Sequence, residues 1–130
     1  MRKFSDTIVN VSLNFNKGQN FHILIGNFLE VFYTFADQEE KSYMMRDAPV
    51  DMTRVELVPF LAAAAHKLAN DYKLPVPPWV FEKRCYLPGD KPYFSTGSKK
   101  GPLSMWFLFM SPSEFKHRNL FVDENVLMRV

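Results

Sequence analysis

The stretch VPFLAAAAHKLANDY, residues 58–72, decides the fold because it carries the clearest helical pattern in this 130-residue chain. The small side chains from Ala62 to Ala65 allow other elements to approach its backbone closely. We therefore expect a central helix around which the rest of the chain packs. Its apolar positions recur at intervals of three or four residues, as expected for one face of a helix: Val58, Leu61, Ala62, Ala65, Leu68, Ala69 and Tyr72.

Pro59 constrains how this helix begins, because proline lacks the amide hydrogen that an interior helical position donates. The helix either kinks at Pro59 or starts after a short turn over 53–57, with Pro59 in its first turn. Thr53 and Glu56 stand at the spacing of a capping box, which favours a helix start close to them.

Helices are also expected before the centre. Residues 4–15 fit an amphipathic helix, with a strand as the alternative, and Asn20 caps a second helix of about 16 residues. An Asp37–Glu40 capping box starts a short third helix that buries Tyr43 and Met44. The second helix carries an apolar stripe, which is typical of a core, with a lipid or cofactor pocket as the alternative: Phe21, Leu24, Ile25, Phe28, Phe32 and Phe35.

The segment 74–98 is expected to be irregular, because residues 74–95 contain five prolines. Proline restricts the backbone to extended conformations, so the segment loses little entropy when it is held against the helices. We expect its rings and one leucine to hold it down while its cations face outward. These side chains are Trp79, Phe81, Tyr86, Leu87, Tyr93 and Phe94.

Three further elements are expected after this segment. Leu103 to Met110 predict a helix over 102–110, SPSE at 111–114 predicts a helix that ends near Asn119, and a last turn or helix follows Asp123. Alternating strand patterns are scarce. The fold class is therefore all-α, with residues 1–130 forming a single compact domain of about six or seven helices.

Charge is unevenly distributed along the chain. The net charge is only +2, but residues 73–118 hold eight lysines and arginines against three acids, with nine aromatic residues between them. Basic residues interleaved with rings are typical of protein interfaces and of nucleic-acid grooves; alternatively, the rings are core and the charges are simply solvated. The expected partner-binding residues are Trp79, Lys83, Arg84, Tyr93, Lys116 and Arg118.

The common catalytic and metal-binding motifs are missing, so we expect neither a cofactor nor a metal. The single cysteine, Cys85, fits a reducing cytoplasm and is more typical of a small buried residue than of a nucleophile activated by Lys83 and Arg84. His22, His66 and His117 fall on separate predicted helices. No uncharged run reaches membrane-spanning length, so a cytoplasmic location away from membranes is expected.

Three stretches carry a resemblance: PPWV at 77–80, KPYF at 91–94 and SPSEFKHRNLFVDENVL at 111–127. Together they resemble the C-terminal region of a group of small, mostly helical bacterial proteins of unassigned function. Some of that group follow a helix-turn-helix domain or occur in toxin–antitoxin-like gene neighbourhoods. The resemblance covers about residues 55–130 and implies no catalytic residue. No helix-turn-helix module is evident ahead of that region.

The leading hypothesis is a non-enzymatic bacterial domain that binds another protein, as a regulatory or antitoxin-like component. The first alternative is a nucleic-acid-associated regulator that uses the basic and aromatic region 73–118. The second alternative is an enzyme with an unrecognised site near Cys85. A homo-oligomer is compatible with the sequence under each hypothesis.

Overall fold

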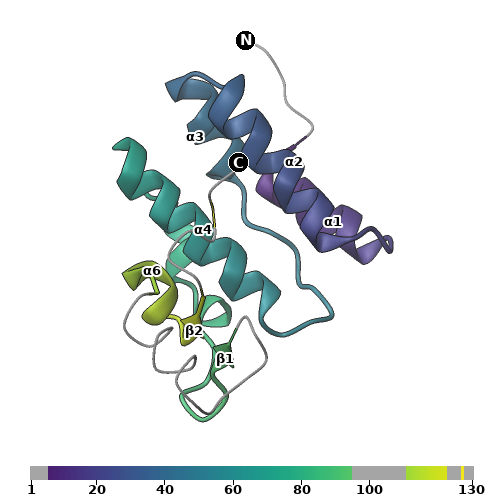
Figure 1. The fold of residues 1–130 in the computed structure, drawn as a ribbon, viewed down its shortest axis with the longest axis vertical. Helices are drawn as coiled ribbons and strands as arrows, with labels where there is room; N and C mark the ends of the chain where they lie inside the picture. The colour runs from purple at the N-terminus through teal and green to yellow at the C-terminus, as the bar shows by residue number, and fades with distance from the viewer. Residues whose placement is uncertain (1–5, 95–110, 123–126, 128–130) are drawn as a thin grey trace.

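The computed structural model describes residues 6–94, 111–122 and 127, and this part of the chain is mainly helical (Figure 1). Five α-helices in it confirm the all-α class, although six or seven were expected. The expected helices at 102–110 and after Asp123 lie outside the described residues. The elements are α1 (Ile8–Asn16), α2 (Phe21–Thr34), α3 (Gln38–Arg46), α4 (Leu57–Tyr72), the 3-10 turns η1 (Pro78–Phe81) and η2 (Lys83–Cys85), β1 (Tyr93–Phe94), α6 (Ser113–Lys116) and β2 (Leu120–Phe121).

Each of the first three helices starts at a polar side chain that accepts a backbone hydrogen bond. Thr7 caps α1, so the helix starts at Ile8 rather than at residue 4. Asn20 caps α2 as expected, and its Oδ1 accepts from the Ile23 amide at 3.2 Å. The expected capping box of α3 is present, with the Asp37 carboxylate accepting from the Glu40 amide at 2.8 Å. These caps satisfy amides that the helices leave unpaired.

The C-terminal end of α2 differs from the expectation. The helix stops at Thr34, so the ring of Phe35 leaves the apolar stripe and is 57% exposed. A buried lysine stabilises this end, because Lys41 Nζ donates to the Ala36 carbonyl at 2.6 Å. The same ammonium lies over the rings of Phe32 and Tyr72, 5.4 and 5.3 Å from their centroids. In α3 itself, Met44 is fully buried while Tyr43 is half-buried.

The start of α4 confirms the second of the two solutions for Pro59. Residues 53–56 form turns, and Pro59 is the third residue of the helix, where no amide donor is required. The expected capping box at Thr53 and Glu56 is wrong. Glu56 makes no side-chain cap, because its carboxylate accepts from Arg54 Nε at 2.8 Å.

The helix α4 is the centre of the described fold. Its four consecutive alanines, residues 62–65, are completely buried. Successive residues of a helix point about 100° apart, so four buried neighbours mean that α4 is covered on every side at this level. Figure 1 shows α1, α2 and α3 on one side of α4, with α6 and the short strands on the other. The turns η1 and η2 and the helix α6 contact α4 directly.

Aromatic rings connect α2 to α4. The rings of Phe21 and Phe60 meet edge to face with centroids 5.6 Å apart, and those of Phe32 and Tyr72 do the same at 5.3 Å. These pairs lie toward opposite ends of the two helices. Their bulk sets the spacing between α2 and α4, in contrast to the close approach that the alanines allow elsewhere on α4.

The segment after residue 110 differs most from the expectation. Ser111 does not cap α6, because its hydroxyl both donates to the Val122 carbonyl and accepts from the Val122 amide, each at 2.8 Å. The helix α6 ends at Lys116, and the chain turns at Asn119, whose φ is 65°. This turn leads into a parallel pairing that the sequence pattern missed, with Tyr93 opposite Leu120. Among the described residues, no helix is long and apolar enough to cross a membrane.

The burial of α4 generates a stability prediction. Replacing Ala63 with leucine should lower the free energy of unfolding by about 1–3 kcal/mol, because the added methylene and methyl groups have no space in the packed interior. The control is Asn27→Leu on the exposed side of α2. This substitution should change the free energy of unfolding by less than about 0.5 kcal/mol. Chemical denaturation of both variants measures the difference. An Ala63→Leu protein as stable as the wild type would contradict close packing around α4.

Candidate functional site

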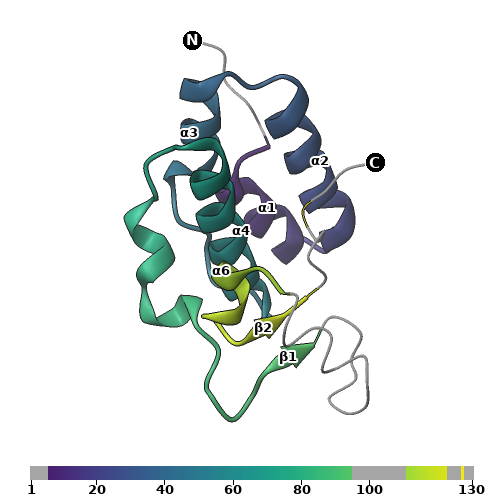
Figure 2. The same ribbon diagram turned by 60° about the vertical axis from the view of Figure 1, so that its left-hand side comes forward.

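The strap, residues 74–87, is held against the helices by buried side chains. Trp79, Val80 and Cys85 are all buried. Trp79 Nε1 donates to the Met45 carbonyl at 2.9 Å. This carbonyl is one of the last in α3 and has no partner within that helix. The two 3-10 turns are the short green coils beside α4 in Figure 2. Trp79 thus connects the strap to α3, and its burial corrects the expectation that it would contact a partner.

Arg118 is also a correction, because it faces inward rather than outward. It is only 1% exposed. Its Nη2 donates to the Val80 carbonyl and its Nη1 to the Glu114 carbonyl, both at 2.9 Å. The guanidinium also lies 4.8 Å from the centroid of the Tyr86 ring. Arg118 therefore connects the strap to the segment around α6 and presents no charge to a partner.

His66 of α4 lies between this buried cation and the surface. Its Nδ1 is 3.2 Å from Arg118 Nη1. Since a guanidinium can only donate, Nδ1 accepts and the ring is neutral in this arrangement. Burial and the nearby Arg118 charge lower the pKa of His66, with a smaller contribution from His117, whereas Glu114 acts in the opposite direction. The outer side of the imidazole contacts the Phe81 ring, with centroids 5.3 Å apart.

Phe81, Lys83 and Arg84 are exposed residues of the strap, and we call these three residues the strap face; Glu82 between them is also exposed and pairs with Arg84. Phe81 was expected to hold the strap down, but its ring is 55% exposed. Lys83 is exposed, and its ammonium takes part in no ion pair within the described part of the chain. Arg84 is partly exposed, and its guanidinium donates to Asp51, Glu82 and the Pro49 carbonyl at 2.8–3.0 Å.

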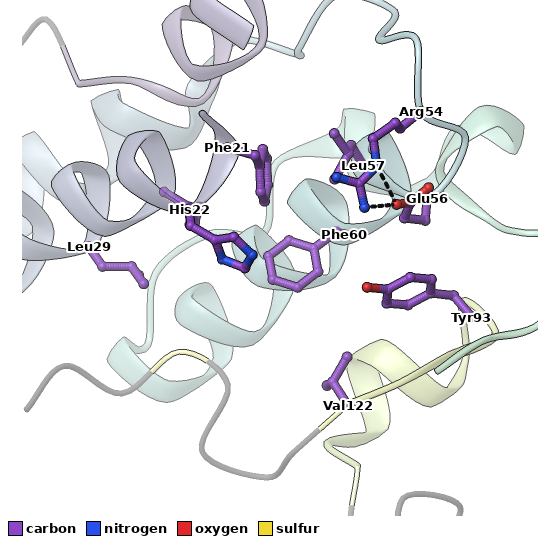
Figure 3. A pocket seen from close by; sticks show the side chains of 10 residues that line it. Phe21, His22, Leu29, Arg54, Glu56, Leu57, Phe60, Tyr93 and Val122 are labelled. Carbon is purple, nitrogen blue, oxygen red and sulfur yellow. Dashed lines mark hydrogen bonds and ion pairs between the residues drawn. The ribbon is translucent and has the colours of Figure 1, made fainter. Parts of the chain in front are cut away.

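The remaining two expected residues lie elsewhere. Lys116 is half-buried in α6. Tyr93 is half-buried in β1 and lines a cavity between α2 and α4 (Figure 3). The six expected binding residues are therefore divided between the interior, the strap face, α6 and this cavity. The exposure of Phe81 had no sequence signal, because an aromatic residue in a 3-10 turn can face either way.

Cys85 has the environment of a structural residue. Its side chain is fully buried, and its Sγ donates to the Trp79 carbonyl at 3.3 Å. Burial raises the pKa of its thiol, and this effect exceeds the opposing effect of the Arg84 charge. A nucleophilic cysteine needs a lowered pKa and access to a substrate. Among the described residues, no group of three His, Cys, Asp or Glu side chains could hold a metal ion.

Comparisons with known proteins give no further guide to the site. No protein-family model matches this sequence, and neither a curated protein nor a solved structure shows detectable similarity to it.

The contact between His66 and Arg118 generates a pH prediction. Because the folded protein lowers the pKa of His66, the unfolded chain binds more protons below about pH 6.5, and the free energy of unfolding should fall as the pH drops through and below that value. His66→Gln can still accept from Arg118 but cannot titrate, so it should show a weaker pH dependence between about pH 7 and 5. Urea denaturation across this pH range measures the free energy of unfolding of the wild type and of His66→Gln.

Glu114 serves as an internal reference for that experiment. Although burial favours its neutral form, the hydrogen bond from Asn70 and the nearby Lys67 and His66 lower its pKa below the usual value for glutamate. The contribution of Glu114 to the free energy of unfolding is therefore lost only at a more acidic pH than the one at which protonation of His66 begins to lower stability. An equal loss of stability for wild type and His66→Gln down to about pH 5 would rule out His66 as the responsible group.

Proposed function

We propose that this chain is a non-enzymatic protein-interaction domain that binds an acidic partner protein through the strap face. The observation that carries the proposal is the 55% exposed ring of Phe81, which is followed along the strap by the exposed cations Lys83 and Arg84. Exposed aromatic rings and arginines commonly provide most of the binding energy at protein interfaces. A ring of this kind would enter an apolar recess of the partner, while the flanking cations meet carboxylates at its edge.

The strap face is also fixed before a partner arrives. On one side of Phe81, Trp79 and Val80 are buried; on the other, Cys85 is buried and Arg84 is tied to Asp51, Glu82 and Pro49. The His66 imidazole contacts the Phe81 ring edge to face. Binding therefore needs little additional ordering of the backbone, which lowers the entropic cost of association.

The charge on this face favours a protein over a nucleic acid. Nucleic-acid binding needs several cations aligned along a groove, free to contact phosphates. In the described part of the chain, Arg118 is buried and Arg84 already pairs with two carboxylates. Lys83 with one exposed ring suits a compact acidic patch better than a phosphate backbone.

The biological setting of the proposal comes from the sequence resemblance alone. The likeness of residues 55–130 to small helical bacterial proteins suggests a bacterial regulatory role, of the kind in which an antitoxin-like component binds its cognate protein. A cytoplasmic location would suit a chain with a single, buried thiol.

Two exposed phenylalanines allow a matched test of the ring. Phe81→Ser should reduce recovery of the partner at least about tenfold, because a central apolar anchor is lost. Phe35→Ser removes an equally exposed ring, 57% against 55%, from the end of α2 and should leave recovery unchanged. Quantitative mass spectrometry of proteins that co-purify from the native host compares the two variants with wild type. Recovery of the same proteins at the same levels by Phe81→Ser would refute the proposal.

Lys83 allows a test of the charge. Lys83→Glu should slow association with the partner identified above and weaken its salt dependence, because charges at the edge of an interface act mainly on the association rate. Lys91→Glu, at an exposed position beyond the strap, is the control. Biolayer interferometry at several salt concentrations measures the rates. Charge reversal at Arg84 is less informative because it also breaks contacts to Asp51 and Glu82.

A salt-sensitive gel shift with DNA or RNA, lost in Lys83→Glu, would favour the nucleic-acid alternative.

A further inference from the structure

The cavity between α2 and α4 has a volume of about 190 Å³ and apolar walls. It lies beside the Phe21–Phe60 ring pair that connects these helices. Because large rings meet there, the two backbones stay apart and leave space between them. The side chains that form its apolar part are Phe21, Ile25, Leu29, Leu57, Phe60 and Val122.

The size and walls of this cavity suit one small aromatic molecule. An engineered apolar cavity of about 150 Å³ in another protein binds benzene, so this cavity can hold a single ring with a substituent or two small fused rings. Phe60 contacts both Phe21 and Phe115 edge to face, with centroids 5.6 and 5.3 Å apart. A further ring could join this array with the same favourable geometry.

Two polar side chains at the cavity provide hydrogen bonding. The His22 imidazole and the Tyr93 hydroxyl point toward the Phe60 ring from opposite sides (Figure 3). Neither side chain forms a hydrogen bond with another residue in the part of the chain that the structure describes. Each can donate or accept, so either could bind a hydroxyl or an N–H group of a molecule in the cavity.

The charged side chains at the cavity neutralise each other. Arg54 donates to the Glu56 carboxylate through both Nε and Nη2, and the Glu56 side chain is only 14% exposed (Figure 3). A ligand carboxylate would have to compete with Glu56 for Arg54, and a ligand ammonium would have to compete with Arg54 for Glu56. The cavity therefore selects against a charged group.

From these observations we infer that the cavity binds a small neutral aromatic compound with one hydrogen-bonding group, of the class of phenols and indoles. The apolar walls take the ring, and the Tyr93 hydroxyl or the His22 imidazole takes the polar group. This inference does not rest on the proposed protein-binding function, because the cavity and the strap face use different residues.

Titration of the full ¹⁵N-labelled chain with p-cresol and with indole tests the inference. Saturable chemical-shift changes at the amides of cavity-lining residues are expected, with a Kd of about 0.1–1 mM for ligands of this size. Benzoate and benzylamine, which carry one charge of either sign, should bind at least about tenfold more weakly. The absence of saturable shifts with both neutral compounds, or equal binding of the charged ones, would overturn the inference.

Variants locate the binding within the cavity. Leu29→Phe fills part of it and should abolish p-cresol binding, whereas Leu13→Phe makes the same change at a 40% exposed position and should not. If Leu29→Phe does not fold, Tyr93→Phe provides a milder test. It should weaken p-cresol binding roughly three- to tenfold, which corresponds to one hydrogen bond, and leave toluene binding unchanged. If Tyr93→Phe and His22→Ala both bind p-cresol as tightly as the wild type does, neither polar group contacts the ligand. That result would overturn the assignment.

Discussion

The burial of the Arg118 guanidinium is the constraint on which the C-terminal half of the described structure depends. A buried charge is costly unless its donors are satisfied. Here carbonyl oxygens of Val80 and Glu114 accept from its two terminal nitrogens, His66 receives a further contact, and Tyr86 covers it with a ring, while its buried Nε has no hydrogen-bond partner in the part of the chain that the structure describes. These partners come from the strap, α6 and α4. The guanidinium can keep its hydrogen bonds only if all three remain in place, so it fixes their relative positions.

The strap needs such an anchor because most of its backbone hydrogen bonds join residues three apart within the strap itself and do not attach it to the helices. Prolines at 75, 77 and 78 donate no amide hydrogen, and the two 3-10 turns are short. Side chains therefore hold the segment: Trp79 bonds to α3, Arg118 bonds to Val80, and Arg84 bonds to Asp51 and to the Pro49 carbonyl. Once these positions are fixed, the intervening Phe81 has to face outward. The exposed ring is thus a consequence of how the strap is held.

The central helix contacts its neighbours in two ways, and each produces a different feature. The two 3-10 turns of the strap and α6 approach the backbone of α4 closely. Where α4 meets α2, the contacts run through rings at Phe60 and Tyr72, and a cavity remains beside one of them. Close packing on one side supports the strap face. Looser packing on the other leaves space for a ligand.

The sequence by itself determined the five described helices, the caps of α2 and α3, the position of Pro59 in the first turn of α4 and the irregular strap. These features depend on neighbours within about four residues, which a local pattern records. Only the tertiary structure decided that Arg118 and Trp79 are buried, that Phe81 and Phe35 are exposed, and that Tyr93 pairs with Leu120 and faces a cavity. The physical reason is that a basic or aromatic side chain can satisfy its interactions in water or inside the protein. Which of these it does depends on partners 34 to 52 residues away, such as Val80 and His66 for Arg118 and Met45 for Trp79.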